Sequence, residues 1–137
     1  MITVSHVGGD RLRIAIRGHE LYVDQPVEDG GEDTAPTPTE LFLGSLAACV
    51  EFYAERFLRR HGLGTEGLSV GCEYEWAQNP NRVGQIQLVV QAPTLTPQLH
   101  EAFVRVIGHC TVHNTLRQPP VVRTVVEVGE SQVAAAG

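Results

Sequence analysis

The alternation of apolar and polar positions along the chain indicates both strands and helices. Residues 2–24 contain three strand-like segments joined at short glycine-containing turns, which predicts a meander. Residues 68–76 and 83–91 alternate with period two on either side of an Asn-Pro-Asn turn, which predicts a β-hairpin. A last strand is expected over residues 121–128. Strands interrupted by helical segments in this order predict an α+β domain.

The clearest predicted element is a long helix that begins at Pro38. Thr37 is the expected N-cap, Pro38 occupies the first helical position, and Glu40 lies three residues after the cap, which together form a capping box. Basic residues followed by Gly62 indicate the end of the helix. These signals predict a helix of roughly 24 residues, long enough to run through the centre of the domain.

The first half of this helix, residues 41–50, is apolar on every side apart from Ser45. Such a pattern is typical of a helix that is buried all round. A chain of 137 residues supplies little cover for it. A homodimer in which two copies share the helix is therefore the simplest expectation.

The segment after the hairpin predicts two shorter helices. Residues 98–110 carry an apolar stripe at helical spacing after Thr96, which is the expected cap. Gly108 predicts a break or kink, and residues 111–117 predict a further short helix. The length suits a single domain, which we place at residues 1–128. Residues 129–137 are expected to form a disordered C-terminal tail.

Composition and charge exclude several classes of partner. The net charge of −6 and the pI near 5.4 argue against nucleic-acid binding, which needs a basic surface. No apolar run reaches the ~20 residues of a membrane span, and the first residues lack a secretory signal, so a cytoplasmic location is expected. Three cysteines do not suggest a disulfide framework, and in a reducing compartment such residues are buried, catalytic or metal-binding.

The three cysteines lie in different environments. Cys72 shares a strand face with apolar residues, which favours a buried small hydrophobe. Cys49 lies in the middle of the long helix, where the pattern alone also favours the core. Cys110 follows the predicted helix break and precedes a polar segment, and a helix start would activate its thiol only mildly.

A reactive Cys49 would need a cation from elsewhere in the fold, because burial alone raises the pKa of a thiol. Lowering the pKa of the Cys49 thiol from about 8.5 to about 6 takes about 3.4 kcal/mol. A cation about 4 Å away, at an effective dielectric constant of about 20, could supply ~4 kcal/mol. The predicted strands offer Arg11, Arg13 and Arg17.

Two separate motifs give the chain a family resemblance. The segment PTELFLGSLAAC, residues 38–49, resembles the first signature of the OsmC/Ohr family of osmotically inducible and organic hydroperoxide resistance proteins. The segment CTVHNTL, residues 110–116, resembles its second cysteine site, and the order of elements over residues 2–128 is similar. The resemblance implies the OsmC-like fold, in which antiparallel sheets surround a long buried central helix in an intertwined homodimer.

The resemblance also implies a thiol peroxidase that reduces organic hydroperoxides to alcohols. Cys49 would be the peroxidatic thiol, which attacks the O–O bond and becomes a sulfenic acid. Cys110 would be the resolving thiol, which closes a disulfide. An external dithiol, lipoyl-linked in some members, would regenerate both thiols, and no cofactor or metal is implied.

Two positions differ from the best-studied hydroperoxide-resistance members, which suggests the broader OsmC-like group. Those members have a glutamate directly after the motif's proline, where it orients the catalytic arginine, whereas this chain has Thr39 there and Glu40 next. Glu40 is either part of the site or only the capping-box partner of Thr37. The family arginine follows a Gly-Gly turn, and Arg11 follows that turn here after Asp10, so Arg11 is the candidate stabiliser of the thiolate.

The same residues are also compatible with other functions. His109, Cys110 and His113 are closely spaced, and with Cys49 they could offer nitrogen and sulfur ligands to zinc. A cysteine hydrolase could use Cys110 with a nearby histidine, although no orienting Asp or Asn has a defined place. The main alternative is a non-catalytic OsmC-like dimer whose thiols sense oxidants or whose pocket binds an apolar ligand.

Overall fold

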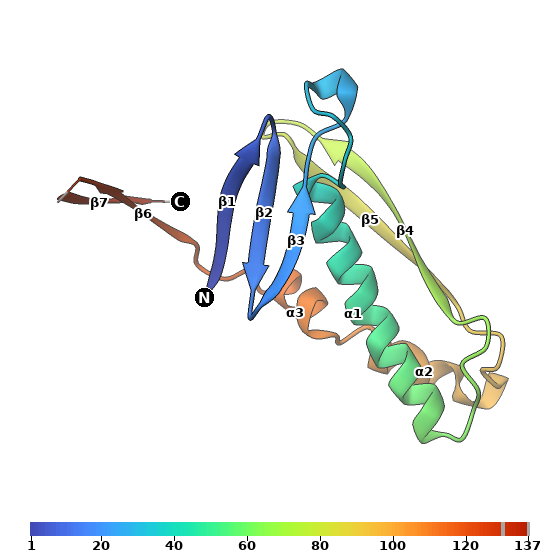
Figure 1. The fold of residues 1–137 in the computed structure, drawn as a ribbon. Helices are drawn as coiled ribbons and strands as arrows, with labels where there is room; N and C mark the ends of the chain where they lie inside the picture. Colours follow the sequence, from blue (N-terminus) through green and yellow to red (C-terminus); the bar gives the residue numbers. More distant parts are fainter. Residues whose placement is uncertain (130, 137) are drawn as a thin grey trace.

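The fold begins with an antiparallel meander, as predicted. The computed structural model describes residues 1–129 and 131–136, with side chains described up to residue 129. One sheet, in the order β1-β2-β3, contains strands β1 (Ile2–Gly8), β2 (Arg11–Ile16) and β3 (His19–Val23) (Figure 1). Gly18 adopts a φ of 87° in the turn between β2 and β3, which a residue with a side chain adopts only at a cost.

Helix α1 (Pro38–Arg60) begins at the predicted capping box. The Thr37 hydroxyl accepts a hydrogen bond from the Glu40 backbone N–H at 3.1 Å, and the Glu40 carboxylate accepts one from the Thr37 backbone N–H at 2.9 Å. At the other end Gly62 adopts a φ of 67°, a conformation that commonly follows a helix. Local sequence signals therefore set both ends of α1.

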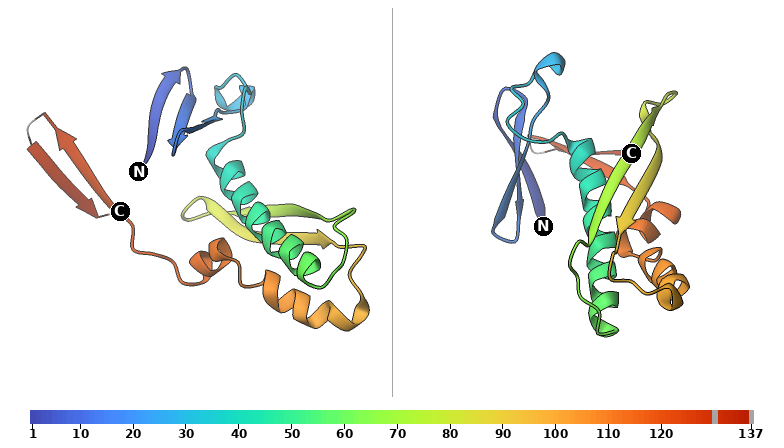
Figure 2. Two further views of the ribbon diagram at one scale, coloured as in Figure 1. Left: turned by 60° about the horizontal axis from the view of Figure 1, so that its bottom comes forward. Right: turned by 90° about the vertical axis from the view of Figure 1, so that its right-hand side faces the viewer.

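A hairpin and two short helices pack together with α1 (Figure 2). These elements are β4 (Ser69–Ala77), β5 (Arg82–Gln91), η2 (Pro97–Leu99), α2 (His100–Ile107) and α3 (Thr111–Arg117). The predicted hairpin and the predicted break after Gly108 are confirmed, because α2 ends before Gly108 and α3 begins after it. Thr96 is the N-cap residue of η2, as predicted, but its side chain makes no capping hydrogen bond.

The core lies along one side of α1 and has two neighbouring parts. One part joins Phe57 and Leu58 of α1 to Phe103 of α2, and the rings of Phe57 and Phe103 meet edge to face at 5.3 Å. The other part surrounds Cys110 and includes Leu46 of α1. Apolar side chains from the hairpin pack against both parts, so α1, the hairpin and the two helices share one core.

The chain ends in a hairpin that projects away from this core (Figure 1). Strand β6 (Arg123–Val128) pairs antiparallel with β7 (Ser131–Ala136), which confirms the last predicted strand. The structure differs from the disordered tail predicted over residues 129–137, because the backbone of residues 131–136 forms β7. Gly129, at a φ of 58°, supplies the reversal that this pairing needs. Residues 130 and 137 lie outside the described residues.

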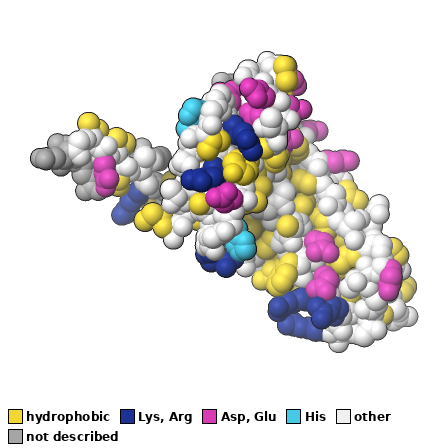
Figure 3. Space-filling view, in the orientation of Figure 1, with side chains coloured by type: hydrophobic (Ala, Val, Ile, Leu, Met, Phe, Trp, Pro, Cys, Tyr) yellow, Lys and Arg dark blue, Asp and Glu magenta, His cyan; other side chains and the backbone are white. Residues whose placement is uncertain are grey.

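A second side of α1 is not covered within the single chain. Phe42 and Phe52 are 38% and 48% exposed, and Figure 3 shows hydrophobic side chains at the surface beside α1. The hairpin and the short helices cover only part of the helix circumference, so the burial on every side expected for residues 41–50 is not reached in one chain. No helix in the described part of the chain is long and apolar enough to cross a membrane.

Asp24 fixes the loop between β3 and α1, which contains the short helix η1 (Val27–Asp29). Its buried carboxylate accepts hydrogen bonds from the Thr34 hydroxyl at 2.6 Å and from the Thr34 backbone N–H at 3.0 Å. The Gln25 backbone N–H donates a third at 2.8 Å. These bonds, with the Thr34 hydroxyl contributing most, lower the pKa of Asp24 to about 2.

The substitution Asp24→Asn is expected to lower the free energy of unfolding at pH 7. Because folding lowers the pKa of Asp24 from 3.8 to about 2, the stabilisation is complete above about pH 4 and is lost as the pH falls toward 2. Urea unfolding of both proteins at pH 7, and at steps between pH 4 and 2, measures the difference. A difference in stability that stays constant across the acid range would contradict this assignment.

Candidate functional site

The fold brings together Cys49 and Cys110, which are far apart in the sequence. Cys49 lies near the middle of α1, and Cys110 is the N-cap residue of α3. Cys110 is completely buried, and the partly buried Cys49 packs against it. Both are free thiols, so the site holds two reduced sulfur groups in contact.

Helix α3 is held against α1 by a second contact one turn away. Tyr53 follows Cys49 by four residues, and its hydroxyl is 3.4 Å from the Thr111 hydroxyl oxygen, which is adjacent in sequence to Cys110. Residues four apart in a helix lie on the same face. The polar contact and the thiol contact are therefore neighbours, and together they set the position of Cys110 against α1.

The environment of Cys110 favours the protonated thiol. Burial is the largest effect and raises the pKa of Cys110, and the interaction with the Cys49 thiol raises it further. The backbone N–H of His113 donates to the Cys110 sulfur at 3.4 Å, and this bond and a weaker one from Val112 oppose the rise in pKa. Cys110 therefore remains a neutral thiol near pH 7.

A cavity of about 350 Å³ lies between α1, β5 and α3, and neither Cys49 nor Cys110 is among its lining residues. Most of its wall is apolar, and three of these side chains also surround Cys110. The lining residues are Leu46 of α1, Ile86 and Leu88 of β5, and His113, Leu116 and Arg117 of α3. The cavity therefore gives an apolar molecule a place next to side chains that cover Cys110, with polar groups on one wall only.

The polar wall of this cavity contains one cation and one neutral imidazole. Desolvation, followed by the charges of Arg117 and His109, lowers the pKa of His113, which keeps it uncharged near pH 7. Arg117 was not predicted as a site residue from the sequence. The available signal was its spacing, because residues 113 and 117 follow Cys110 by three and seven positions and so share a helical face.

The structure does not bring Arg11 or Glu40 to the thiols within one chain. The Arg11 guanidinium lies over the Tyr22 ring at 4.2 Å, in the meander. Glu40 is occupied by the capping box, and nine residues of helix place it about 13.5 Å along the axis from Cys49. The roles of Arg11 and Glu40 in catalysis stay predictions.

The other arginines suggested for the thiolate also lie in the meander. Arg13 of β2 forms an ion pair with Glu20 at 3.4 Å. Arg17 is at the turn after β2, with a φ of 50°. Neither belongs to the group of side chains around Cys49 and Cys110.

The third cysteine and the proposed zinc ligands are placed elsewhere. Cys72 lies opposite Leu88 in the hairpin, is partly buried, and has a pKa raised by that burial, as expected of a small hydrophobe. His109 Nδ1 donates to the Arg105 carbonyl oxygen at 2.6 Å. In the described part of the chain, no three His, Cys, Asp or Glu side chains come together as metal ligands.

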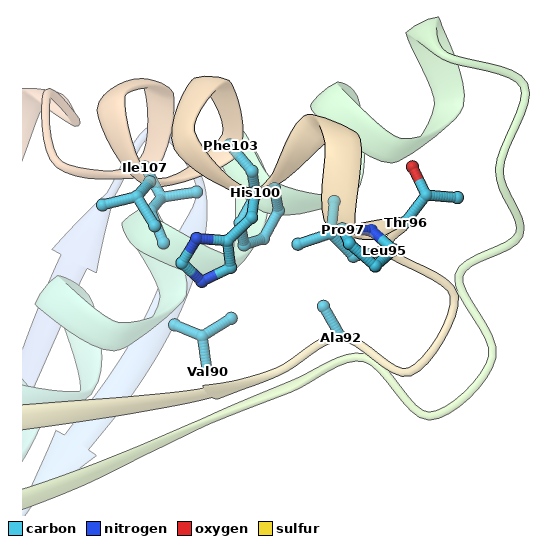
Figure 4. A pocket seen from close by; sticks show the side chains of 9 residues that line it. Val90, Ala92, Leu95, Thr96, Pro97, His100, Phe103 and Ile107 are labelled. Carbon is cyan, nitrogen blue, oxygen red and sulfur yellow. The ribbon is translucent and has the colours of Figure 1, made fainter.

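A larger cavity of about 640 Å³ lies between α2 and the end of β5. Figure 4 shows the His100 imidazole between α2 and Val90, with Phe103 and Ile107 on the helix side. Val90 and Ile107 also pack against the group of side chains around Cys110. Like the smaller cavity, this one contacts the side chains around Cys110 but has neither Cys49 nor Cys110 in its wall.

A cluster of three arginines lies at the C-terminal end of α1 and forms a basic group on the surface (Figure 3). Arg59 pairs with Glu55 at 3.1 Å, and Arg56 lies over the Phe52 ring at 4.6 Å. Arg60 completes the cluster. Basic side chains in a last helical turn interact favourably with the free carbonyl groups there, which accounts for the cluster without a ligand.

Comparison with known structures shows the same fold in several solved proteins. A protein of Psychrobacter arcticus named for osmotic stress induction and detoxification response is 22% identical, with 83% of this chain and 85% of that chain covered and a TM-score of 0.75. An OsmC-like protein of Mycoplasma pneumoniae is 19% identical, with 87% of each chain covered and a TM-score of 0.70. The organic hydroperoxide resistance protein OsmC of Legionella pneumophila is 24% identical, with 85% and 89% covered and a TM-score of 0.65.

The family comparison extends over most of the domain. No protein of curated function matches this chain. The family model described as OsmC-like protein matches residues 30–125, a range that contains both cysteine motifs and the cavity beside them. The α+β fold, with antiparallel sheets and three α-helices in the described part of the chain, agrees with that match. The chain therefore belongs to the OsmC-like protein family.

Proposed function

We propose that this protein is a thiol-dependent peroxidase that reduces organic hydroperoxides to alcohols through Cys49 and Cys110. The single observation that carries the proposal is the contact between these two thiols in the core between α1 and α3. A second thiol within reach can trap a sulfenic acid before further oxidation. The names of the structural relatives, which include organic hydroperoxide resistance proteins, agree with this chemistry.

The first step oxidises Cys49. Its thiolate attacks the terminal oxygen of the hydroperoxide, so that a sulfur–oxygen bond forms and the O–O bond breaks. The leaving alkoxide takes up a proton and becomes the alcohol. Cys49 is then a sulfenic acid, and the hydroperoxide has been reduced by two electrons.

The second step forms a disulfide. Cys110 loses its proton, and its sulfur attacks the sulfur of the Cys49 sulfenic acid. The sulfur–sulfur bond forms as the sulfur–oxygen bond breaks, and the hydroxyl group leaves with a proton as water. An external dithiol then reduces the disulfide by thiol–disulfide exchange and returns both cysteines to thiols.

The raised pKa of Cys110 supports this order of events. A thiol that stays protonated near pH 7 is a weak nucleophile toward a peroxide in solution. Once Cys49 is oxidised, its sulfur is already in contact with Cys110, so the second attack is intramolecular and needs no diffusion. Cys110 therefore suits the resolving role better than the peroxidatic role.

The proposal includes a homodimer in which the partner supplies what one chain lacks. The exposed side chains of Phe42 and Phe52 form an apolar surface on α1. Arg11 lies over Tyr22 in the meander, away from the thiols of its own chain. A second copy that packs on α1 would cover this face and could bring its own Arg11 to Cys49. Within the proposal, Arg11 is the cation that stabilises the Cys49 thiolate.

A non-catalytic dimer that senses oxidants or binds an apolar ligand is the second candidate. The observation that favours it is the placement of Glu40 in the capping box and of Arg11 on Tyr22, where neither acts on a thiol of the same chain. A sensor is oxidised once, whereas an enzyme turns over repeatedly when a dithiol and a peroxide are both present. Multiple turnovers therefore separate the two functions.

The substitution Cys49→Ser is expected to abolish peroxide consumption, because it removes the attacking thiolate. Cys110→Ser should still allow one oxidation but leave Cys49 open to sulfinic acid formation. Consumption of cumene hydroperoxide and of hydrogen peroxide, with dihydrolipoamide or glutathione as the reductant, measures turnover. Intact mass after one equivalent of peroxide identifies the oxidation state.

Cys72→Ser is the matched control, because Cys72 is a partly buried thiol outside the site. It should keep multiple turnovers with the organic peroxide. Turnover retained in Cys49→Ser would overturn the assignment of roles. A wild-type protein that does not turn over with any peroxide, although both thiols react with a thiol reagent, would favour the non-catalytic dimer.

The substitutions Glu40→Ala and Thr37→Ala test whether Glu40 acts only as a cap. Each removes one of the two reciprocal bonds, and the loss of a helix N-cap typically costs about 1 kcal/mol of stability. We expect comparable decreases in stability from denaturant unfolding and an unchanged kcat/KM in both variants. If kcat/KM fell in Glu40→Ala but not in Thr37→Ala, Glu40 would have a role in the site beyond capping.

A further inference from the structure

Helix α3 forms part of the cover over Cys110 but is weakly attached to the rest of the fold. Val112 of α3 packs against the group of side chains around Cys110. The helix has seven residues and none of them is buried, although Cys110 directly before them is completely buried. A helix this short is not stable in water by itself, so contacts with other elements hold it in place. Segments with few buried side chains open locally at a lower free energy than the core does.

The two ends of α3 are attached differently. At its start, the Thr111 hydroxyl oxygen is 3.4 Å from the Tyr53 hydroxyl oxygen of α1. At its end, Leu116 and Arg117 line the cavity of about 350 Å³ that lies between α1, β5 and α3. Side chains that line an unfilled space lose the packing contacts that a filled space would supply. The attachment of α3 to α1 therefore depends on the contacts at its start.

The chain on both sides of α3 is free to change direction. Gly108 and His109 separate α3 from α2, which is anchored in the core by the buried Phe103. Residues 118–122 follow α3, are all exposed, and belong to no helix or strand. Residues between elements are the ones that absorb the change of backbone dihedral angles in a hinge. α3 can therefore move while α2 and the core stay in place.

We propose that α3 is a lid over Cys110 and that Tyr53 is the positioning residue that holds this lid closed. In the closed position the Cys110 side chain is completely buried, so a dithiol in solution has no direct approach to its side of a Cys49–Cys110 disulfide. Opening of α3 breaks the contact between Tyr53 and Thr111, exposes the Cys110 sulfur and admits the dithiol. The inference rests on the proposed function only where it names the dithiol.

The reaction in the open position is a thiol–disulfide exchange. The first thiolate of the dithiol attacks one protein sulfur, the protein S–S bond breaks, and the released protein thiolate takes up a proton. The second thiol of the dithiol then loses its proton and displaces the protein from the mixed disulfide. The dithiol is oxidised to its own disulfide, and the protein gains two electrons.

Alkylation of Cys110 tests the lid without any peroxide. The full-length variant Cys49→Ser/Cys72→Ser retains Cys110 as its one thiol, and N-ethylmaleimide labels that thiol when α3 opens. We expect Tyr53→Phe in this variant to raise the rate of alkylation about threefold, because a hydrogen bond at 3.4 Å is at the weak end of the usual range. Equal rates with and without the Tyr53 hydroxyl overturn the inference.

Thr111→Val removes the other hydroxyl at nearly constant shape and should raise the rate by the same factor. Because the two hydroxyls form one contact, the variant with both substitutions should be alkylated no faster than either single variant. Rates that multiply would instead show two independent effects and overturn the assignment. Tyr74→Phe is the matched control, because Tyr74 is an exposed tyrosine of β4 outside the group of side chains around Cys110, and it should leave the rate unchanged.

The dependence of alkylation on urea separates opening of α3 from unfolding of the whole domain. Opening of a short helix exposes little surface, so low urea concentrations should change the rate only slightly. Unfolding of the domain exposes the whole core and has a much larger m value. Alkylation that follows the full m value of unfolding, even at low urea, overturns the lid.

Reduction by dihydrolipoamide tests what the lid admits. In protein that retains Cys49 and Cys110, the disulfide is formed with diamide and its reduction is followed by stopped-flow measurement. Tyr53→Phe should speed the reduction about threefold, as it speeds alkylation. Faster alkylation without faster reduction would mean that the dithiol enters by another route, and would overturn the role given to the lid. If no disulfide forms, the proposed function fails, whereas the alkylation rates still decide whether α3 opens.

Discussion

The burial of Cys110 against α1 is the constraint on which the rest of the site depends. A thiol that is completely buried at the N-cap of α3 has to reach the core just where that helix begins, and the break after Gly108 makes this possible. The contact between Tyr53 and Thr111 then fixes the start of α3 against the turn of α1 that follows Cys49. Because the two helices meet at this point, the thiols meet as well, and the cavity opens on the side of α3 that carries Arg117.

Local signals made much of the fold predictable from the sequence. The capping box of Thr37 and Glu40 depends on residues three apart, and the positive φ of Gly62 depends on one residue, so both ends of α1 followed from short-range chemistry. The hairpin pattern and the helix break had similarly local causes. The terminal hairpin was missed because a turn at Gly129 is a weak signal without knowledge of the strand that pairs back on β6.

The site was less predictable, because its parts come together only through tertiary packing. Both cysteine motifs were evident, but their contact joins segments whose distance in space no local pattern specifies. Glu40, the acidic residue within the first motif, has two possible roles from the sequence, and the structure places its carboxylate in the capping box. Arg117 was overlooked because a single arginine near the end of a polar helix normally indicates a solvated surface, and only the position of α3 beside β5 makes it part of a cavity wall.

The uncovered side of α1 and the distant meander have one explanation in common. A helix with exposed Phe42 and Phe52 loses the stabilisation that burial of those rings would supply, at roughly 25 cal/mol for each Å² of apolar surface. A second copy could restore it, and the same packing could place a meander, with its arginines, over the thiols of the other chain. Under this arrangement a single chain holds both sulfur atoms and the apolar cavity but lacks the cation that a buried thiolate needs. Assembly would then determine not only the stability of α1 but also the reactivity of Cys49, so the two properties should be lost together when the copies separate.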